Sequence, residues 1–108
     1  MDGFVRVGRA DDIPMLEGRA VTVGARRIAI FRTGEGFHAL AAACPHRGGP
    51  LADGIVADSC VTCPLHNWRF DLRTGAGAGD NPGVESFEVM ERGGELWLRI
   101  PDELQEAA

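Results

Sequence analysis

The sequence predicts an all-β fold, an antiparallel sandwich or small barrel, built as a single domain over residues 1–108. The chain has 108 residues, which is enough for one modest hydrophobic core. Its 15 Gly and 6 Pro interrupt the chain at short intervals. The short runs between these residues are rich in Val, Ile, Phe and Leu, which favour strands. No window longer than about ten residues keeps a helical period.

Short strands are expected in order along the chain. Residues 4–7 alternate weakly in polarity, and residues 11–14 are typical of a turn or a single helical turn. The next expected strands cover 19–24, 26–32 and 37–43, with a Gly-containing hairpin loop at 33–36. Two short strands with a turn near Asp58 and Ser59 are expected within 54–63, and another at 69–72. Strands 84–91 and 95–100 form the last expected hairpin, and the tail 102–108 is expected to be helical or frayed.

Charge and targeting signals exclude several classes of function. All 11 basic residues are Arg, the acidic residues number 16, and the net charge is −5. A negative chain with no basic run is a poor ligand for phosphate backbones, so we expect no nucleic-acid partner. The N-terminus is not typical of a signal peptide, and no stretch is long enough to span a membrane, so we expect a cytoplasmic protein. Its charge predicts a basic surface on its partner.

Cysteine and histidine residues cluster in two short segments. The first segment reads CPHRGGPL and begins at Cys44, and the second reads CPLHNW and begins at Cys63. The spacing is Cys-x-His, then 16 residues, then Cys-x-x-His, which adds His46 and His66 as candidate ligands. Two thiolates and two imidazoles suit either Zn²⁺ or an iron–sulfur cluster with mixed ligands. A structural zinc module therefore remains an alternative, and a colourless protein would favour it over a red-brown cluster.

The two segments resemble the two-box signature of Rieske [2Fe–2S] proteins. The resemblance implies the family's antiparallel sandwich of three small sheets, with a cluster-binding subdomain over 43–83 inside the single domain. It implies one [2Fe–2S] cluster per chain, with Cys44 and Cys63 on one iron and His46 and His66 on the other. It also implies that residues 80–83 form the proline-containing loop that covers the cluster. Because all four ligand positions are filled, we expect an electron carrier that is not catalytic alone.

The segments also indicate which kind of Rieske protein this is. High-potential members carry an extra Cys in each box, whereas this chain has Gly49 and Leu65 there, which predicts a low potential. His66-Asn67-Trp68, followed by DLRTG, resembles the small subunit of NAD(P)H-dependent assimilatory nitrite reductase. That subunit is the favoured interpretation, and its partner would be the sirohaem large subunit. The alternative is a free Rieske ferredoxin between a ferredoxin reductase and an aromatic-ring oxygenase.

The remaining signals have ordinary structural interpretations. Cys60 is expected to be a small buried thiol, because positions three apart on a strand face opposite sides. His38 is expected to be structural, and the Gly-rich run 75–79 is expected to be a turn because no helix follows it. Arg47 and Arg69 flank the ligand segments. They are either ordinary surface charges or salt-sensitive docking residues.

Overall fold

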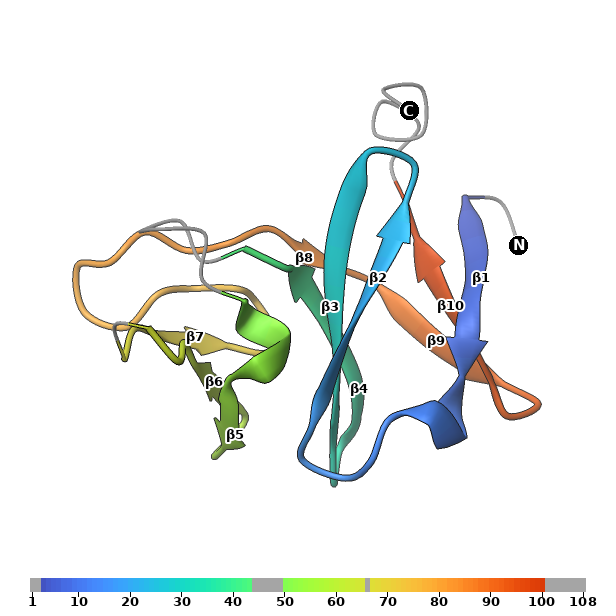
Figure 1. The fold of residues 1–108 in the computed structure, drawn as a ribbon, viewed down its shortest axis with the longest axis horizontal. Coiled ribbons are helices and arrows are strands. Elements are labelled where there is room, and N and C mark those ends of the chain that lie inside the picture. The colour runs from blue at the N-terminus through green and yellow to red at the C-terminus, as the bar shows by residue number, and fades with distance from the viewer. Residues whose placement is uncertain (1–2, 44–49, 66, 101–108) are drawn as a thin grey trace.

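The computed structural model describes residues 3–43, 50–65 and 67–100 and shows three small antiparallel sheets (Figure 1). The first sheet has the strand order β1 (Phe4–Arg9), β10 (Glu95–Arg99), β9 (Val89–Arg92). The second has the order β2 (Gly18–Val23), β3 (Arg26–Thr33), β4 (Gly36–Ala41), β8 (Ser86–Phe87). The third has the order β5 (Ile55–Ala57), β6 (Cys60–Thr62), β7 (Arg69–Asp71). Two 3₁₀ turns, η1 (Ala10–Asp12) and η2 (Leu51–Asp53), complete the described elements. The all-β prediction of three small sheets is confirmed.

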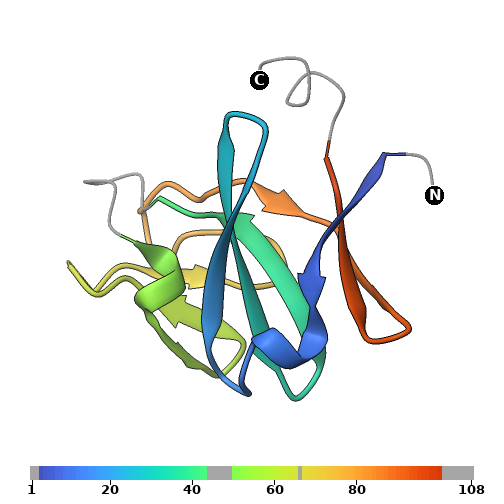
Figure 2. The same ribbon diagram turned by 45° about the vertical axis from the view of Figure 1, so that its right-hand side comes forward.

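The second sheet is the middle layer of the molecule. In Figures 1 and 2 it lies between the first sheet on the right and the third sheet on the left. Strand β3 is buried on both faces, which explains why its sequence is an unbroken apolar run from Ile28 to Phe31. Ala29 and Phe31 pack toward the third sheet, whereas Ile28 and Ile30 pack toward the first. One strand thus supplies both halves of the core.

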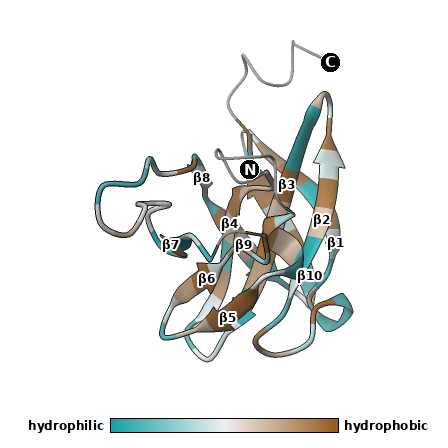
Figure 3. Ribbon diagram, turned by 60° about the vertical axis from the view of Figure 1, so that its left-hand side comes forward, coloured by the Kyte–Doolittle hydropathy of each residue, from teal (hydrophilic) through white to brown (hydrophobic). Residues whose placement is uncertain are grey.

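Two hydrophobic clusters result from this layering. We call the one between the second and third sheets the upper cluster, defined by these buried residues: Ala29, Phe31, Leu40, Leu51, Val56, Val61, Cys63, Phe70 and Leu72. The lower cluster, between the second and first sheets, consists of Ala10, Ile13, Ile28, Ile30, Ala39, Phe87, Leu96, Leu98 and Ile100. Strands β5 and β6 are mostly apolar along their length (Figure 3). The small third sheet is therefore held to the rest of the molecule by apolar packing.

The structure divides the expected strand 84–91 into two. Ser86 and Phe87 form β8 and pair with β4, whereas Val89 to Arg92 form β9 and pair with β10. The amide of Arg99 donates to the carbonyl of Glu88 (2.9 Å), at the point where the chain leaves one sheet for the other. No Gly or Pro marks this change of partner in the sequence, so local pattern predicts one continuous strand.

The other strands lie close to their expected positions. The hairpin of β5 and β6 turns at Asp58 and Ser59, as the sequence predicts. Leu96, Leu98 and Ile100 are buried together on one face of the last strand. The expected helical or frayed tail at 102–108 lies outside the described residues. In the part of the chain that the structure describes, no helix has the length and apolarity to cross a membrane.

Candidate metal centre

The second ligand segment forms a closed loop between β6 and β7. The amide of Cys63 donates to the carbonyl of Trp68 (2.7 Å), and the amide of Asn67 donates to the carbonyl of Cys63 (3.1 Å). Asn67 has a φ of 60°, in the left-handed region that Gly and Asn tolerate best. These bonds fix the backbone on both sides of the loop. The backbone of Cys63 is therefore held by hydrogen bonds at both ends of the loop.

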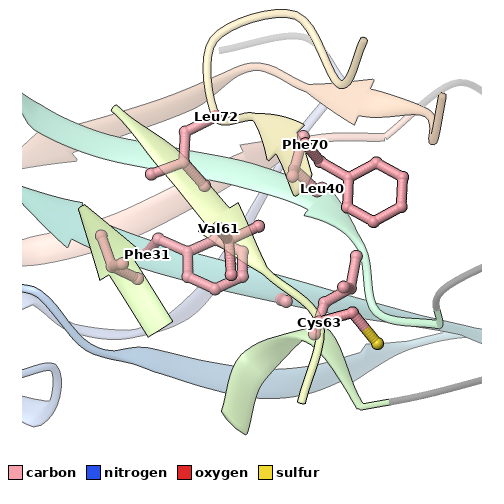
Figure 4. Close-up of a cluster of buried hydrophobic side chains, with 9 residues drawn as sticks. Phe31, Leu40, Val61, Cys63, Phe70 and Leu72 are labelled. Carbon is pink, nitrogen blue, oxygen red and sulfur yellow. The ribbon is translucent and has the colours of Figure 1, made fainter. Parts of the chain in front are cut away.

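The Cys63 side chain is fully buried in the upper cluster. In Figure 4 its sulfur is directed away from Phe31 and Val61, out of the apolar packing. Cys63 forms no disulfide with Cys60, the other described cysteine. A buried thiol that is held at a strand end and turned away from the apolar side chains is suited to bind a metal.

The flanks of the first ligand segment lie in the same part of the molecule. Ala43 and Pro50, which flank residues 44–49, pair as an antiparallel bridge, and the amide of Leu51 donates to the carbonyl of Ala42 (2.9 Å). Leu51 belongs to the upper cluster, as Cys63 does. The bases of both predicted ligand segments therefore meet over one hydrophobic cluster.

One of the four predicted ligands, Cys63, lies among the described residues. Cys44, His46 and His66 lie outside the described residues, as does Arg47. Among residues 3–43, 50–65 and 67–100, no three His, Cys, Asp or Glu side chains gather as a metal site. Cys63 is thus the predicted ligand that lies among the described residues. Its burial, its free thiol and its fixed backbone fit a cluster ligand.

The segment that contains the proline loop lies beside β7. Gly77 bridges Phe70, the amide of Asp71 donates to Ala76 (2.9 Å), and that of Ala78 donates to Arg69 (3.0 Å). Because this pairing is antiparallel, the chain after Ala78 runs toward the loop that begins at Cys63. Residues 79–83 are therefore directed to the end of the sheet that bears the second ligand segment. The expected turn at 75–79 is followed by this loop and by no helix.

Two residues that were not expected to be ligands have other surroundings. Cys60 is half-buried, more open than the buried thiol that the sequence predicts, because it faces away from the core side of β6. His38 is half-buried, and its Nε2 lies 3.3 Å from the Thr33 hydroxyl. Burial lowers the pKa of His38 below its usual value. The nearby charge of Arg73 lowers the pKa further, whereas the charges of Glu35 and Asp71 raise it and offset part of the shift. His38 thus has the structural role expected of it.

The fold and site together correspond to a known family. The family model described as the Rieske [2Fe-2S] domain matches residues 3–91. The chain therefore belongs to the Rieske [2Fe–2S] family and carries a cluster of that type. When bound, such a cluster takes up and releases single electrons.

Curated relatives and solved structures give the same family. The chain is 40% identical over 70 residues to the anthranilate 1,2-dioxygenase ferredoxin subunit of Burkholderia cepacia, a match that covers 65% of each chain. It is 31% identical over 98 residues to ferredoxin CarAc of Metapseudomonas resinovorans, covering 88% of this chain and 92% of the relative. The match to a human Rieske domain-containing protein spans 49% of that relative.

Two solved structures share the fold over almost the whole described chain. One is the ferredoxin of carbazole 1,9a-dioxygenase from Nocardioides aromaticivorans, with a TM-score of 0.84, 29% identity, and coverage of 93% of this chain and 100% of that one. Another is a putative NADPH nitrite reductase small subunit, with a TM-score of 0.82, 24% identity, and coverage of 88% and 96%. At that identity the second likeness concerns the fold alone.

Proposed function

We propose that this protein is a Rieske ferredoxin that carries electrons from a reductase to an aromatic-ring oxygenase. The observation that carries the proposal is its similarity to two ferredoxins that it matches nearly from end to end, one of which is the ferredoxin of carbazole 1,9a-dioxygenase. These are ferredoxin CarAc, of which 92% is covered, and the Nocardioides ferredoxin, of which 100% is covered. The nitrite reductase small subunit shares the fold at lower identity. The ferredoxin is thus preferred here, whereas the sequence motifs favour the nitrite reductase small subunit.

The geometry of Asn67 explains why the motif is a weak guide to the partner. Rieske ferredoxins usually have Gly where this chain has Asn67, and the His-Asn-Trp string favours the nitrite reductase subunit. Asn67 has a φ of 60°, a conformation that both Asn and Gly adopt readily. His-Asn-Trp and His-Gly-Trp therefore differ at one position, where Asn and Gly meet the same backbone requirement. Asn at this position is thus weak evidence for either partner protein.

The small subunit of a nitrite reductase remains the second candidate. The motif Asp71-Leu72-Arg73-Thr74-Gly75 favours it, since this string follows the second box in that subunit. In the structure the same residues form a turn, in which the Asp71 carboxylate accepts from the amides of Arg73 (2.7 Å) and Thr74 (3.3 Å). Such a turn serves the fold with either partner.

We further propose Cys44, His46, Cys63 and His66 as the four cluster ligands, within a cluster-binding part that spans 43–83. The two described cysteines provide a matched test. Cys63→Ser should abolish the visible and electron paramagnetic resonance spectra of the cluster, because it removes a thiolate ligand. Cys60→Ser should leave both spectra unchanged. Intact spectra in Cys63→Ser would refute the assignment of that ligand.

Reconstitution separates the two candidate functions. The holoprotein is added to a ring-hydroxylating oxygenase and its NADH-dependent reductase, both freed of their own ferredoxin, and product formation is measured. In parallel it is added to a sirohaem nitrite reductase large subunit with NADPH and nitrite. We expect turnover in the first mixture and independent elution from the oxygenase in gel filtration, because electron-transfer encounters are weak. Turnover in the second mixture alone, with co-elution, would establish the subunit role.

Two further properties belong to this proposal. The absence of an extra Cys in each box, with Leu65 and Gly49 in those places, supports a potential near the lower end of the Rieske range. Direct electrochemistry of the holoprotein measures it, and a strongly positive midpoint would contradict the proposal. The cytoplasm, where reductases and NADH are found, is the proposed location.

A further inference from the structure

Arginines on the described part of the chain fall into paired and unpaired groups. Five ion pairs are Arg6–Glu95, Arg19–Glu17, Arg26–Glu85, Arg73–Asp71 and Arg99–Glu88. Arg27 and Arg69 are exposed, and neither side chain has a hydrogen bond or ion pair with any of residues 3–43, 50–65 and 67–100. An unpaired guanidinium presents a fork of donors that matches a carboxylate.

Arg27 lies beside the first ligand segment. Its carbonyl accepts from the amide of Ala42 (3.1 Å), one residue before the bridge of Ala43 with Pro50. Its side chain lines a hollow of about 270 Å³. The other lining residues are small and uncharged: Ala20, Ala42, Ala43, Pro50 and Ala52. A carboxylate that enters this hollow meets one positive charge among apolar walls, where ion pairing is stronger than in open water.

Arg69 has the equivalent place beside the second ligand segment. It directly follows Trp68, whose carbonyl closes the loop onto Cys63, and it begins β7. Its side chain lines a second hollow, of about 350 Å³, together with Cys60, Phe70, Asp71, Ala76, Gly77 and Ala78. Asp71 is the carboxylate in this lining, and it is already occupied by the amides of Arg73 and Thr74. Arg69 is therefore free to bind an acid from outside.

The carboxylates of this region are mostly turned elsewhere. Glu85 pairs with Arg26 at 2.9 Å, and Asp53 lines a different hollow that it shares with Glu17 and Arg19. Asp80 is exposed on the loop after Ala78. Each predicted ligand segment is thus flanked by an arginine that has no acidic partner among the described residues.

We propose that Arg27 and Arg69 form a two-point carboxylate-binding surface that docks an acidic patch of the redox partner against the cluster end. The inference rests on the proposed electron-transfer function and names the chemistry of the partner surface. The net charge of −5 favours a partner surface that is basic as a whole, as the sequence predicts, whereas the two arginines favour a local acidic patch on that surface at the point of contact.

A chemically defined surface can stand in for the partner. Holoprotein is adsorbed on gold coated with a carboxylate-terminated monolayer, and the electron-transfer rate is measured by voltammetry. The double variant Arg27→Gln/Arg69→Gln is compared with Arg92→Gln, which removes another exposed arginine, on β9 in the far sheet. We expect the double variant to lose at least about tenfold in rate, corresponding to about 1.4 kcal/mol. Arg92→Gln should keep the wild-type rate.

The visible spectrum of each variant confirms that the cluster is loaded, so lost docking is distinguished from a lost cluster. Equal rates for the double variant and Arg92→Gln would overturn the proposal. A wild-type rate that is higher on an ammonium-terminated monolayer than on the carboxylate one would also overturn it. Failure of reconstitution with an oxygenase would instead count against the ferredoxin role, and leaves the electrode comparison intact.

Discussion

Asn67 shows how one backbone angle limits the choice of residue at the site. Its φ of 60° lies in the region where a Cβ atom crowds the following carbonyl, a cost that Gly avoids and Asn partly offsets. The residue stands between the predicted ligand His66 and Trp68, and its amide closes the loop onto the carbonyl of Cys63. Any residue that opposes this angle would disturb the loop that carries two of the proposed ligands.

Asn67 is therefore a place where two substitutions should differ in how much stability they cost. Asn67→Gly should leave the free energy of unfolding within about 1 kcal/mol of wild type. Asn67→Val should cost about 1–3 kcal/mol, because a β-branched side chain is strained at positive φ. Chemical denaturation of the holoprotein measures both. Equal stability of the two variants would show that the angle imposes no constraint.

His38 predicts a dependence of stability on pH. Burial lowers its pKa from 6.5, so the folded state binds this proton less readily than the unfolded state does. Its contribution is fully present above pH 6.5 and is lost as the pH falls through 6.5 toward the lowered folded value. His38→Gln keeps a side chain that can hydrogen-bond to Thr33 and removes this titration. The stability difference between wild type and variant should therefore shrink on acidification, as urea denaturation from pH 8 to about pH 5 would show. A difference that stays constant across this range would refute it.

At the scale of elements, the segment from Gly75 to Val84 is held by close backbone approach. A Cβ atom on Gly77 would lie 2.5 Å from the carbonyl oxygen of Asn81 and 2.6 Å from that of Pro82. A Cβ atom on Gly83 would lie 2.6 Å from the carbonyl oxygen of Gly75. Glycine is therefore needed at Gly77 and Gly83, because the backbone around residues 75–77 lies against the backbone around residues 81–83.

Gly77→Ala should therefore destabilise the proline loop. We expect a loss of about 1–3 kcal/mol, together with faster bleaching of the cluster, because the loop must move away from β7. Gly34→Ala is the matched control, since nothing lies within 4 Å of a Cβ atom built there. Thermal unfolding and the decay of visible absorbance measure the two effects. Identical behaviour of both variants would contradict the packing argument.

At the scale of the whole molecule, the second sheet separates two hydrophobic clusters, of which one lies next to the ligand segments and the other does not. The upper cluster contains Cys63 and lies beneath the bases of both ligand segments, whereas the lower cluster joins the first and second sheets. The two clusters share no residue but are linked through neighbouring positions of β3 and β4. Stability is common to both, but the surroundings of the ligand segments belong to the upper cluster.

Matched substitutions in the two clusters test this division. Leu72→Val in the upper cluster and Leu98→Val in the lower cluster each reshape a side chain that is at most 1% exposed. Both should cost about 1 kcal/mol of stability, because each leaves a small void. Only Leu72→Val should accelerate loss of cluster absorbance at a temperature where both variants remain folded. Equal acceleration by Leu98→Val would show that the two cores act as one.

The sequence by itself determined the all-β class and most strand positions, and it predicts the two ligand segments. Each of these depends on local information: the alternation of the last strand, the turn at Asp58 and Ser59, and the short Cys-to-His spacings. Tertiary structure alone decided that β8 and β9 belong to different sheets, since pairing partners far along the chain set that boundary. It also decided that Arg27, 17 residues before Cys44 in sequence, lies beside Ala43 and Pro50, which flank the first ligand segment. Strand pairing brings such residues together, and no local pattern records it.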